Sequence, residues 1–85
     1  MNDYELNNTQ LNTIFQTADL SLAATLSLWY PIEEIDKTIL RKAQFLFKRC
    51  DRLDELVESY WRRELTVEPQ SFFNQLKAIK ARLYE

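Results

Sequence analysis

The residues that most enzymes use for catalysis are scarce in this chain. It has no histidine and no glycine, and its single cysteine is Cys50. Without histidine, acid–base chemistry near neutral pH would need a carboxylate or a lysine with a shifted pKa. Without glycine, the chain lacks the loops that cradle phosphates in Walker and Rossmann sites. Lys48, Arg49 and a helix N-terminus could lower the pKa of Cys50, but a small structural residue in a turn is the preferred interpretation. We therefore expect neither an enzyme nor a cofactor.

Carboxylates form two clusters that could supply oxygen ligands to a hard cation such as Mg²⁺ or Ca²⁺. The clusters are Glu33, Glu34 and Asp36, followed by Asp51, Asp54, Glu55 and Glu58. Asp54 and Glu58 are four residues apart, which would place both on one face of a helix. No calcium-loop spacing accompanies them. A solvated helix face explains the second cluster more simply, so no metal site is expected.

Charge is distributed unevenly, although the net charge is only −2. Residues 1–36 contain no Lys or Arg, and all 11 basic residues lie from Lys37 onward. Lys42, Lys48 and Arg49 lie along or beside a predicted strand, where they could contact the phosphates of a nucleic acid. Lysines on a strand also guard against edge-to-edge aggregation, and the acidic pI of about 5.1 favours that interpretation. Nucleic-acid binding is retained as the alternative.

Aromatic residues are abundant, at 13% of the chain. Most of them have the spacing of core residues, but their number exceeds what a small core requires. Because Trp and Tyr are enriched at interfaces, Trp29, Tyr30 and Trp61 are the candidates for contact with a protein partner.

The elements that would position these residues centre on a predicted strand and helix. Ala43, Phe45 and Phe47 alternate with more polar neighbours, which predicts a strand over 41–48 with these three facing the core. The next apolar residues recur at helical spacing and predict a helix over 52–64, capped by Asp51.

Three further elements complete the prediction. An earlier strand over 32–37 would pair with the strand over 41–48 through a loop at 38–40. Pro69, at a first helical position, predicts a last helix over 69–83. A first helix over 18–29, capped by Thr17, would be apolar around its whole circumference. So small a domain has little room to bury such a helix, which suggests self-association as a homodimer.

The fold class expected from these elements is α+β, a two-stranded antiparallel hairpin packed with three helices in the order α-β-β-α-α. Residues 1–14 would form a flexible N-terminal tail and residues 15–85 a single small domain. The uncharged stretch 20–32 is too short to cross a bilayer, and no signal peptide precedes it. A lone cysteine fits a reducing compartment, so we expect a soluble cytoplasmic protein without membrane contact.

Several segments resemble a family of small uncharacterised proteins from bacteria, archaea and their viruses, a domain of unknown function. The segments are TADLSLAA at 17–24, AQFLF at 43–47, LDELVESYW at 53–61, VEP at 67–69 and LKAIKARLY at 76–84. The resemblance implies the same order of elements and brings no established activity. Family members commonly have glycine after the first helix, in the hairpin turn and after the second helix, and this chain has none.

The predicted function is a non-enzymatic protein-interaction or accessory module, self-associating as a homodimer, in a microbial or viral setting. The alternative is a nucleic-acid-binding accessory protein that uses the basic strand face.

Overall fold

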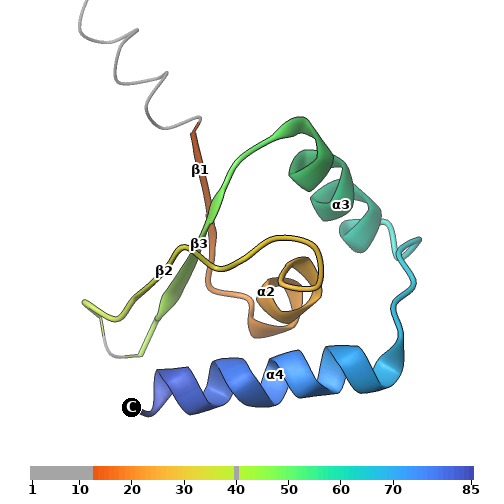
Figure 1. Cartoon of the computed structure of the whole chain (residues 1–85). Coiled ribbons are helices and arrows are strands. Elements are labelled where there is room, and N and C mark those ends of the chain that lie inside the picture. Colours follow the sequence, from red (N-terminus) through yellow and green to blue (C-terminus); the bar gives the residue numbers. More distant parts are fainter. Residues whose placement is uncertain (1–12, 40) are drawn as a thin grey trace, which may run out of the picture.

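Three strands and three helices make up the fold of the computed structural model, which describes residues 13–39 and 41–85 (Figure 1). In chain order the elements are β1 (Ile14–Thr17), α2 (Leu20–Leu26), β2 (Glu34–Asp36), β3 (Gln44–Lys48), α3 (Asp51–Trp61) and α4 (Pro69–Leu83). The predicted α+β class is confirmed. The predicted order was incomplete, because a strand precedes the first helix.

The strands form one antiparallel sheet in the order β1-β3-β2, with β3 in the centre. Phe15 of β1 and Ile35 of β2 lie opposite Phe47 and Phe45 of β3. The two-stranded hairpin expected from the sequence therefore gains β1 as a third strand, on the other side of β3. Of the predicted tail over 1–14, residues 1–12 lie outside the described part of the chain, and Ile14 is the first residue of β1.

The strand alternation predicted for β3 is confirmed. Phe45 and Phe47 are almost fully buried, whereas Lys48 at the end of the strand is exposed. The core joins both rings to residues from all three helices, namely Leu22, Ala23, Ala24, Leu26, Leu53, Leu56 and Ile79. One face of the sheet thus packs against the helices, as expected for a strand with one apolar face.

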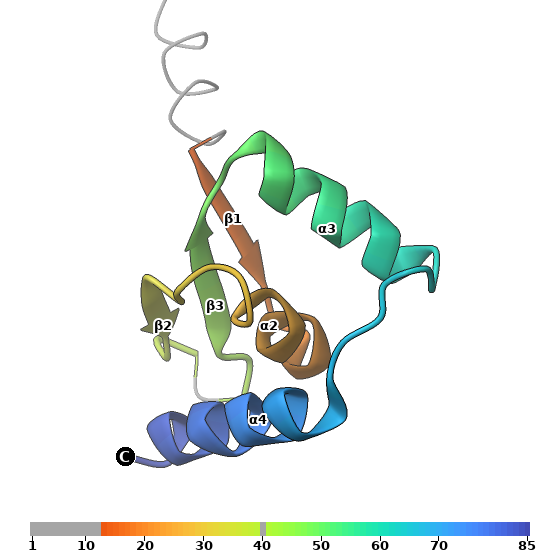
Figure 2. The same cartoon turned by 45° about the vertical axis from the view of Figure 1, so that its right-hand side comes forward.

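α2 lies in the middle of the molecule, where it contacts β1, α3 and α4 (Figures 1 and 2). Every residue from Leu22 to Leu26 is buried, including the polar Thr25, whose hydroxyl donates to the Ser21 carbonyl at 2.9 Å. The apolar circumference of this helix is therefore satisfied within a single chain, and it gives no reason for self-association.

α2 is also shorter than predicted, and its N-cap is a different residue. The N-cap is Asp19, whose Oδ1 accepts from the Leu22 N–H at 3.0 Å. Thr17, the predicted cap, is the last residue of β1, and its hydroxyl accepts from the Asp19 N–H at 3.0 Å. The two side chains together turn the chain from strand into helix.

α3 begins and ends differently from the prediction. Asp51 is its first residue, and the N-cap position is taken by Cys50, whose side chain makes no cap hydrogen bond. At the other end, the N–H of Glu64 donates to the Ser59 carbonyl at 2.9 Å and that of Arg63 to the Tyr60 carbonyl at 3.0 Å. This is a Schellman motif, and it stops the helix at Trp61 rather than at residue 64.

α4 matches the predicted bounds of 69–83, with Pro69 at its start. Glu68 caps it, because its carboxylate accepts from the N–H groups of Ser71 at 2.7 Å and Gln70 at 3.1 Å. In the described residues, no helix is both long enough and apolar enough to cross a membrane.

Candidate binding surface

The structure separates the three basic residues that the sequence suggested for nucleic-acid binding. Lys42 precedes β3 and, like Tyr84, lines a cavity at the C-terminal end of α4. Lys48 and Arg49 lie at the opposite end of the strand, and they share a different hollow with Glu33. They therefore do not form one continuous basic strip.

The interpretation of these lysines as edge guards is wrong, because β3 is the central strand. The sheet edges are β1 and β2, and neither contains Lys or Arg. On the exposed face of the sheet, Glu34 lies opposite Leu46 and Asp36 lies opposite Gln44. Directly opposite residues project from the same face, so this face combines Lys48 with two carboxylates.

Three of the four carboxylates of α3 are paired with arginines. Their closest N–O distances are 3.0 Å for Asp54–Arg49, 3.5 Å for Glu55–Arg52 and 3.4 Å for Glu58–Arg62. These are exposed pairs that add little stability, but they balance much of the acidic charge of the helix. Among residues 13–39 and 41–85, no three side chains of the metal-ligating types gather closely enough to hold an ion.

The aromatic residues suggested as partner contacts have different surroundings. Trp29 is 40% exposed and Trp61 is 60% exposed. The Trp61 ring packs edge-on against the Tyr60 ring, with 5.0 Å between their centroids. Tyr30 is half-buried, and its hydrogen bond with the Cys50 thiol raises the pKa of its phenol, with burial adding to the shift. Trp61 lines a cavity to which neither of the other two contributes.

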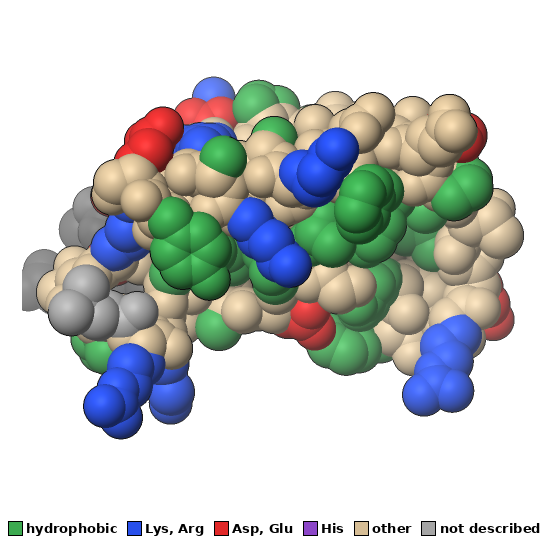
Figure 3. Space-filling view, turned by 90° about the horizontal axis from the view of Figure 1, so that it is seen from below, with side chains coloured by type: hydrophobic (Ala, Val, Ile, Leu, Met, Phe, Trp, Pro, Cys, Tyr) green, Lys and Arg blue, Asp and Glu red, His purple; other side chains and the backbone are tan. Residues whose placement is uncertain are grey.

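A more ordered set of exposed side chains lies along α4. We call Phe73, Lys77, Lys80 and Tyr84 the α4 stripe. Their spacings of four, three and four residues place them within an arc of about 60° on one side of the helix axis. Phe73 is 55% exposed and Tyr84 is 83% exposed. Figure 3 shows this side of the molecule, where basic side chains lie between exposed hydrophobic ones.

The α4 stripe has no acidic counterpart on its own helix. The segment Pro69–Leu83 contains Lys77, Lys80 and Arg82 and no Asp or Glu. The Lys77 ammonium lies 5.2 Å from the centroid of the Phe73 ring, in a cation–π contact. No ion pair involves Lys77 or Lys80 in the part of the chain that the structure describes.

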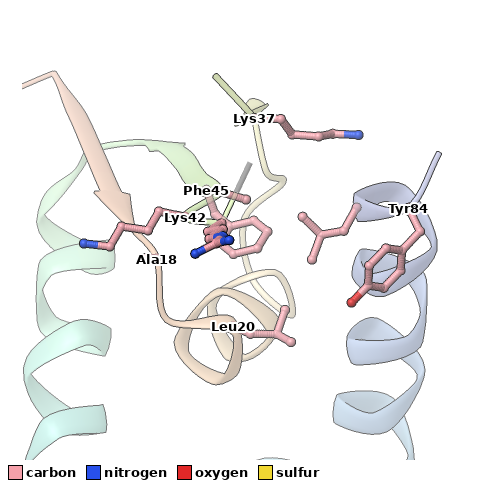
Figure 4. A pocket seen from close by; sticks show the side chains of 9 residues that line it. Ala18, Leu20, Lys37, Lys42, Phe45 and Tyr84 are labelled. Atoms are coloured by element: carbon pink, nitrogen blue, oxygen red, sulfur yellow. The ribbon is translucent and has the colours of Figure 1, made fainter. Parts of the chain in front are cut away.

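A cavity of about 320 Å³ continues this surface beyond the end of α4. Its lining consists of Ala18, Leu20, Lys37, Arg41, Lys42, Ala43, Phe45, Leu83 and Tyr84. Lys37 is held at the end of the helix, because its ammonium donates to the Arg82 carbonyl at 2.9 Å. In Figure 4, Tyr84 lies on one side of the cavity and Lys42 extends away from it on the other, with Phe45 between them. The cavity is basic, but Lys37 and Lys42 point in different directions.

Sequence reasoning did not select the α4 stripe as a site, although its spacing is visible in the sequence. Helical spacing separates Phe72, which shares a face with Leu76 and Ile79, from Phe73, and in the structure Phe72 is half-buried and Phe73 exposed. Tyr84 adjoins Leu83, which packs against the core.

Comparisons with known proteins give a family and no activity. Neither the curated proteins nor the solved structures contain a match to this chain. The family described as "Domain of unknown function (DUF5659)" matches residues 12–85, which include every strand and helix above. The resemblance noted in the sequence is thus confirmed to this extent, and the chain belongs to that family.

Proposed function

We propose that this protein is a non-catalytic module that binds another protein. The observation that carries this proposal is the α4 stripe, in which two aromatic rings, each more than half exposed, flank two lysines on one side of a helix. Exposed apolar groups that gather on one rigid element mark interaction sites more often than scattered ones do. Aromatic residues also provide much of the binding energy where proteins meet.

Affinity capture from native lysate, with and without nuclease, tests this function. We expect wild-type protein to retain a specific protein partner after nuclease treatment. The double variant Phe73→Ala/Tyr84→Ala should lose that partner while its circular dichroism stays unchanged, because both side chains are largely exposed.

Trp61→Ala is the matched control, since it removes an exposed ring of another surface. Retention of the partner by this control supports the α4 stripe. Loss with Trp61→Ala alone would instead assign binding to the surface around Trp61, one of the partner contacts suggested by the sequence. A partner whose capture requires intact nucleic acid would contradict direct protein binding.

Nucleic-acid binding is the second candidate, and the basic cavity is the observation that favours it. Lys37, Arg41 and Lys42 line this cavity, and no carboxylate is among the lining residues. Phosphate contacts release counterions, so binding should weaken steeply with salt.

Fluorescence anisotropy with a labelled single-stranded oligonucleotide tests this second candidate. Replacing Lys37, Arg41 and Lys42 by Gln should reduce the log–log salt slope by about two to three units, near one per lost contact. Lys48→Gln/Arg49→Gln is the control on the distant end of β3. No binding by wild-type protein at low salt would rule the candidate out.

Self-association, a cytoplasmic location and a microbial or viral setting are further parts of the proposal. Because α2 is buried, a homodimer would have to use another surface, such as the α4 stripe. An exposed, free Cys50 supports a reducing compartment such as the cytoplasm.

A further inference from the structure

We propose that the α4 stripe docks an acidic amphipathic segment of a partner protein. This inference rests on the protein-binding function proposed above and names the chemistry of the partner. It follows from the charge, the geometry and the ring environment of the stripe.

The charge of the two exposed helices is unequal after internal pairing. Three of the four carboxylates of α3 have arginine partners at 3.0 to 3.5 Å, and Asp51 has none among the described residues. Lys77 and Lys80 of α4 have no such partner among the described residues, although Lys77 contacts an aromatic ring. The positive charge on α4 is therefore available to a binding partner, and electrostatic complementarity calls for an acidic one.

The geometry fits a segment that runs along the helix. Phe73 and Tyr84 are 11 positions apart, which corresponds to about 16 Å at 1.5 Å per residue. The two lysines lie between them on the same side. A partner helix of three to four turns, or an extended segment of similar length, could place apolar side chains on both rings and carboxylates on both ammonium groups.

The surroundings of Phe73 favour a peptide over a nucleic acid. The Lys77 ammonium already occupies one face of that ring, at 5.2 Å from its centroid. Proteins that bind single-stranded nucleic acids stack the bases on exposed aromatic rings. A base that stacked on this face of Phe73 would first have to displace the Lys77 ammonium. A carboxylate can instead approach Lys77 while an apolar side chain contacts the free part of the ring.

The probe for the experiment is a labelled synthetic peptide of about 15 residues, long enough to cover the stripe as a helix. It has a stripe of leucines flanked by glutamates. A second peptide replaces each glutamate by lysine, and a third probe is a single-stranded oligonucleotide. Full-length protein is titrated with each, and amide chemical shifts locate the binding site.

We expect the acidic peptide to bind and to shift the amides of residues 73–84, and the basic peptide not to bind. Lys80→Glu should weaken the acidic peptide by about fivefold or more, since it replaces an attraction by a repulsion. Lys48→Glu, the same charge change on the exposed face of the sheet, should leave its affinity unchanged. Far-UV circular dichroism and thermal melting should show both variants folded.

Three results would overturn the inference. The first is an affinity for the acidic peptide that falls equally with Lys80→Glu and with Lys48→Glu. The second is binding of the oligonucleotide at residues 73–84 that is tighter than binding of the acidic peptide. The third is dimerisation of the protein alone that Lys80→Glu abolishes. If the acidic peptide does not bind but Phe73→Ala/Tyr84→Ala still releases a captured protein, the partner chemistry is wrong and the protein-binding function stands. If the double variant releases nothing, the protein-binding function through α4 also fails.

Discussion

At the scale of single residues, Arg63 has the most unusual backbone of the described chain. Its φ of 61° lies in the left-handed region, the only such value recorded for a non-glycine residue in the part that the structure describes. This is the position after a helix C-cap that glycine usually occupies, because a Cβ atom there costs about 1–2 kcal/mol. The absence of glycine after this helix, noted in the sequence, therefore has a structural cost at one identifiable residue.

Arg63→Gly should stabilise the protein, by about 0.5–1 kcal/mol after allowing for the greater entropy of glycine in the unfolded chain. Urea unfolding measures the change. Arg62→Gly is the control, because Arg62 has an ordinary right-handed conformation and exposed ion pairs. It should destabilise the protein, and a stabilising effect at both positions would contradict the backbone argument.

Single residues also show where sequence reasoning succeeds. Phe45 and Phe47 could be assigned to the core because a strand exposes alternate residues to opposite faces. On α4, helical spacing likewise places Phe72, Leu76, Ile79 and Leu83 on one face, and all four lie in the core or pack against it. The spacing does not show how far the neighbouring residues are exposed, because that depends on where α2 and the sheet lie.

At the scale of elements, capping side chains define where α2 and α4 begin. Glu68 accepts two backbone N–H groups at the start of α4, and Asp19 accepts one at the start of α2. The hydrogen bonds from Ser71 and Gln70 hold the pKa of the Glu68 carboxyl below its usual value. The folded state thus favours the ionised form of Glu68, which links the stability of α4 to pH.

Glu68→Ala should lower the melting temperature near neutral pH, where the carboxylate caps the helix. Because the folded pKa is below the unfolded one, this stabilisation is present above the unfolded value of about 4.3 and is lost as pH falls through the folded value. The difference in melting temperature between wild type and variant should therefore shrink towards pH 3. Glu33→Ala, whose carboxylate caps no helix, is the control, and a constant difference for Glu68→Ala across pH would contradict the linkage.

Elements also show why β1 was not predicted. Its four residues, Ile14 to Thr17, do not alternate between apolar and polar, because two apolar residues are followed by two polar ones. The apolar Ile14 lies on the exposed face of the sheet and is 40% exposed. A strand this short is specified by its pairing with β3, where Phe15 meets Phe47 across a sequence separation of 32 residues. Such pairing is a tertiary property that no local pattern reports.

At the scale of the whole molecule, α2 joins the sheet to both other helices. The sequence correctly indicated a helix buried on most sides, but the inference that a second chain must bury it was not required. Three elements of the same chain, β1, α3 and α4, supply the contacts that bury α2. The α4 stripe lies on the exposed side of one of these elements, so its accessibility follows from how α4 packs against α2.

Leu26→Glu should unfold the protein rather than convert a dimer into a monomer, because Leu26 is fully buried in the core. A carboxylate there would lose the packing of leucine and lack a partner, a cost of about 3 kcal/mol or more. Circular dichroism and sedimentation at micromolar concentration measure the outcome. Trp29→Glu, three residues later and partly exposed, should remain folded. A folded monomer of Leu26→Glu beside a wild-type dimer would restore the original idea.

The central position of β3 has a consequence for synthesis on the ribosome. β1, α2 and β2 all emerge before residues 44–48, and each edge strand finds its hydrogen-bonding partner only in β3. β2 can pair with β3 as soon as the 7-residue connection 37–43 is complete. Pairing of β1 with β3 instead closes a loop of 26 residues, 18–43, at a greater entropic cost. Until then α2 lacks the cover of Phe45 and Phe47. Because α3 and α4, which also cover α2, are synthesised after β3, the nascent chain is vulnerable to misassociation until the strand and both later helices are complete.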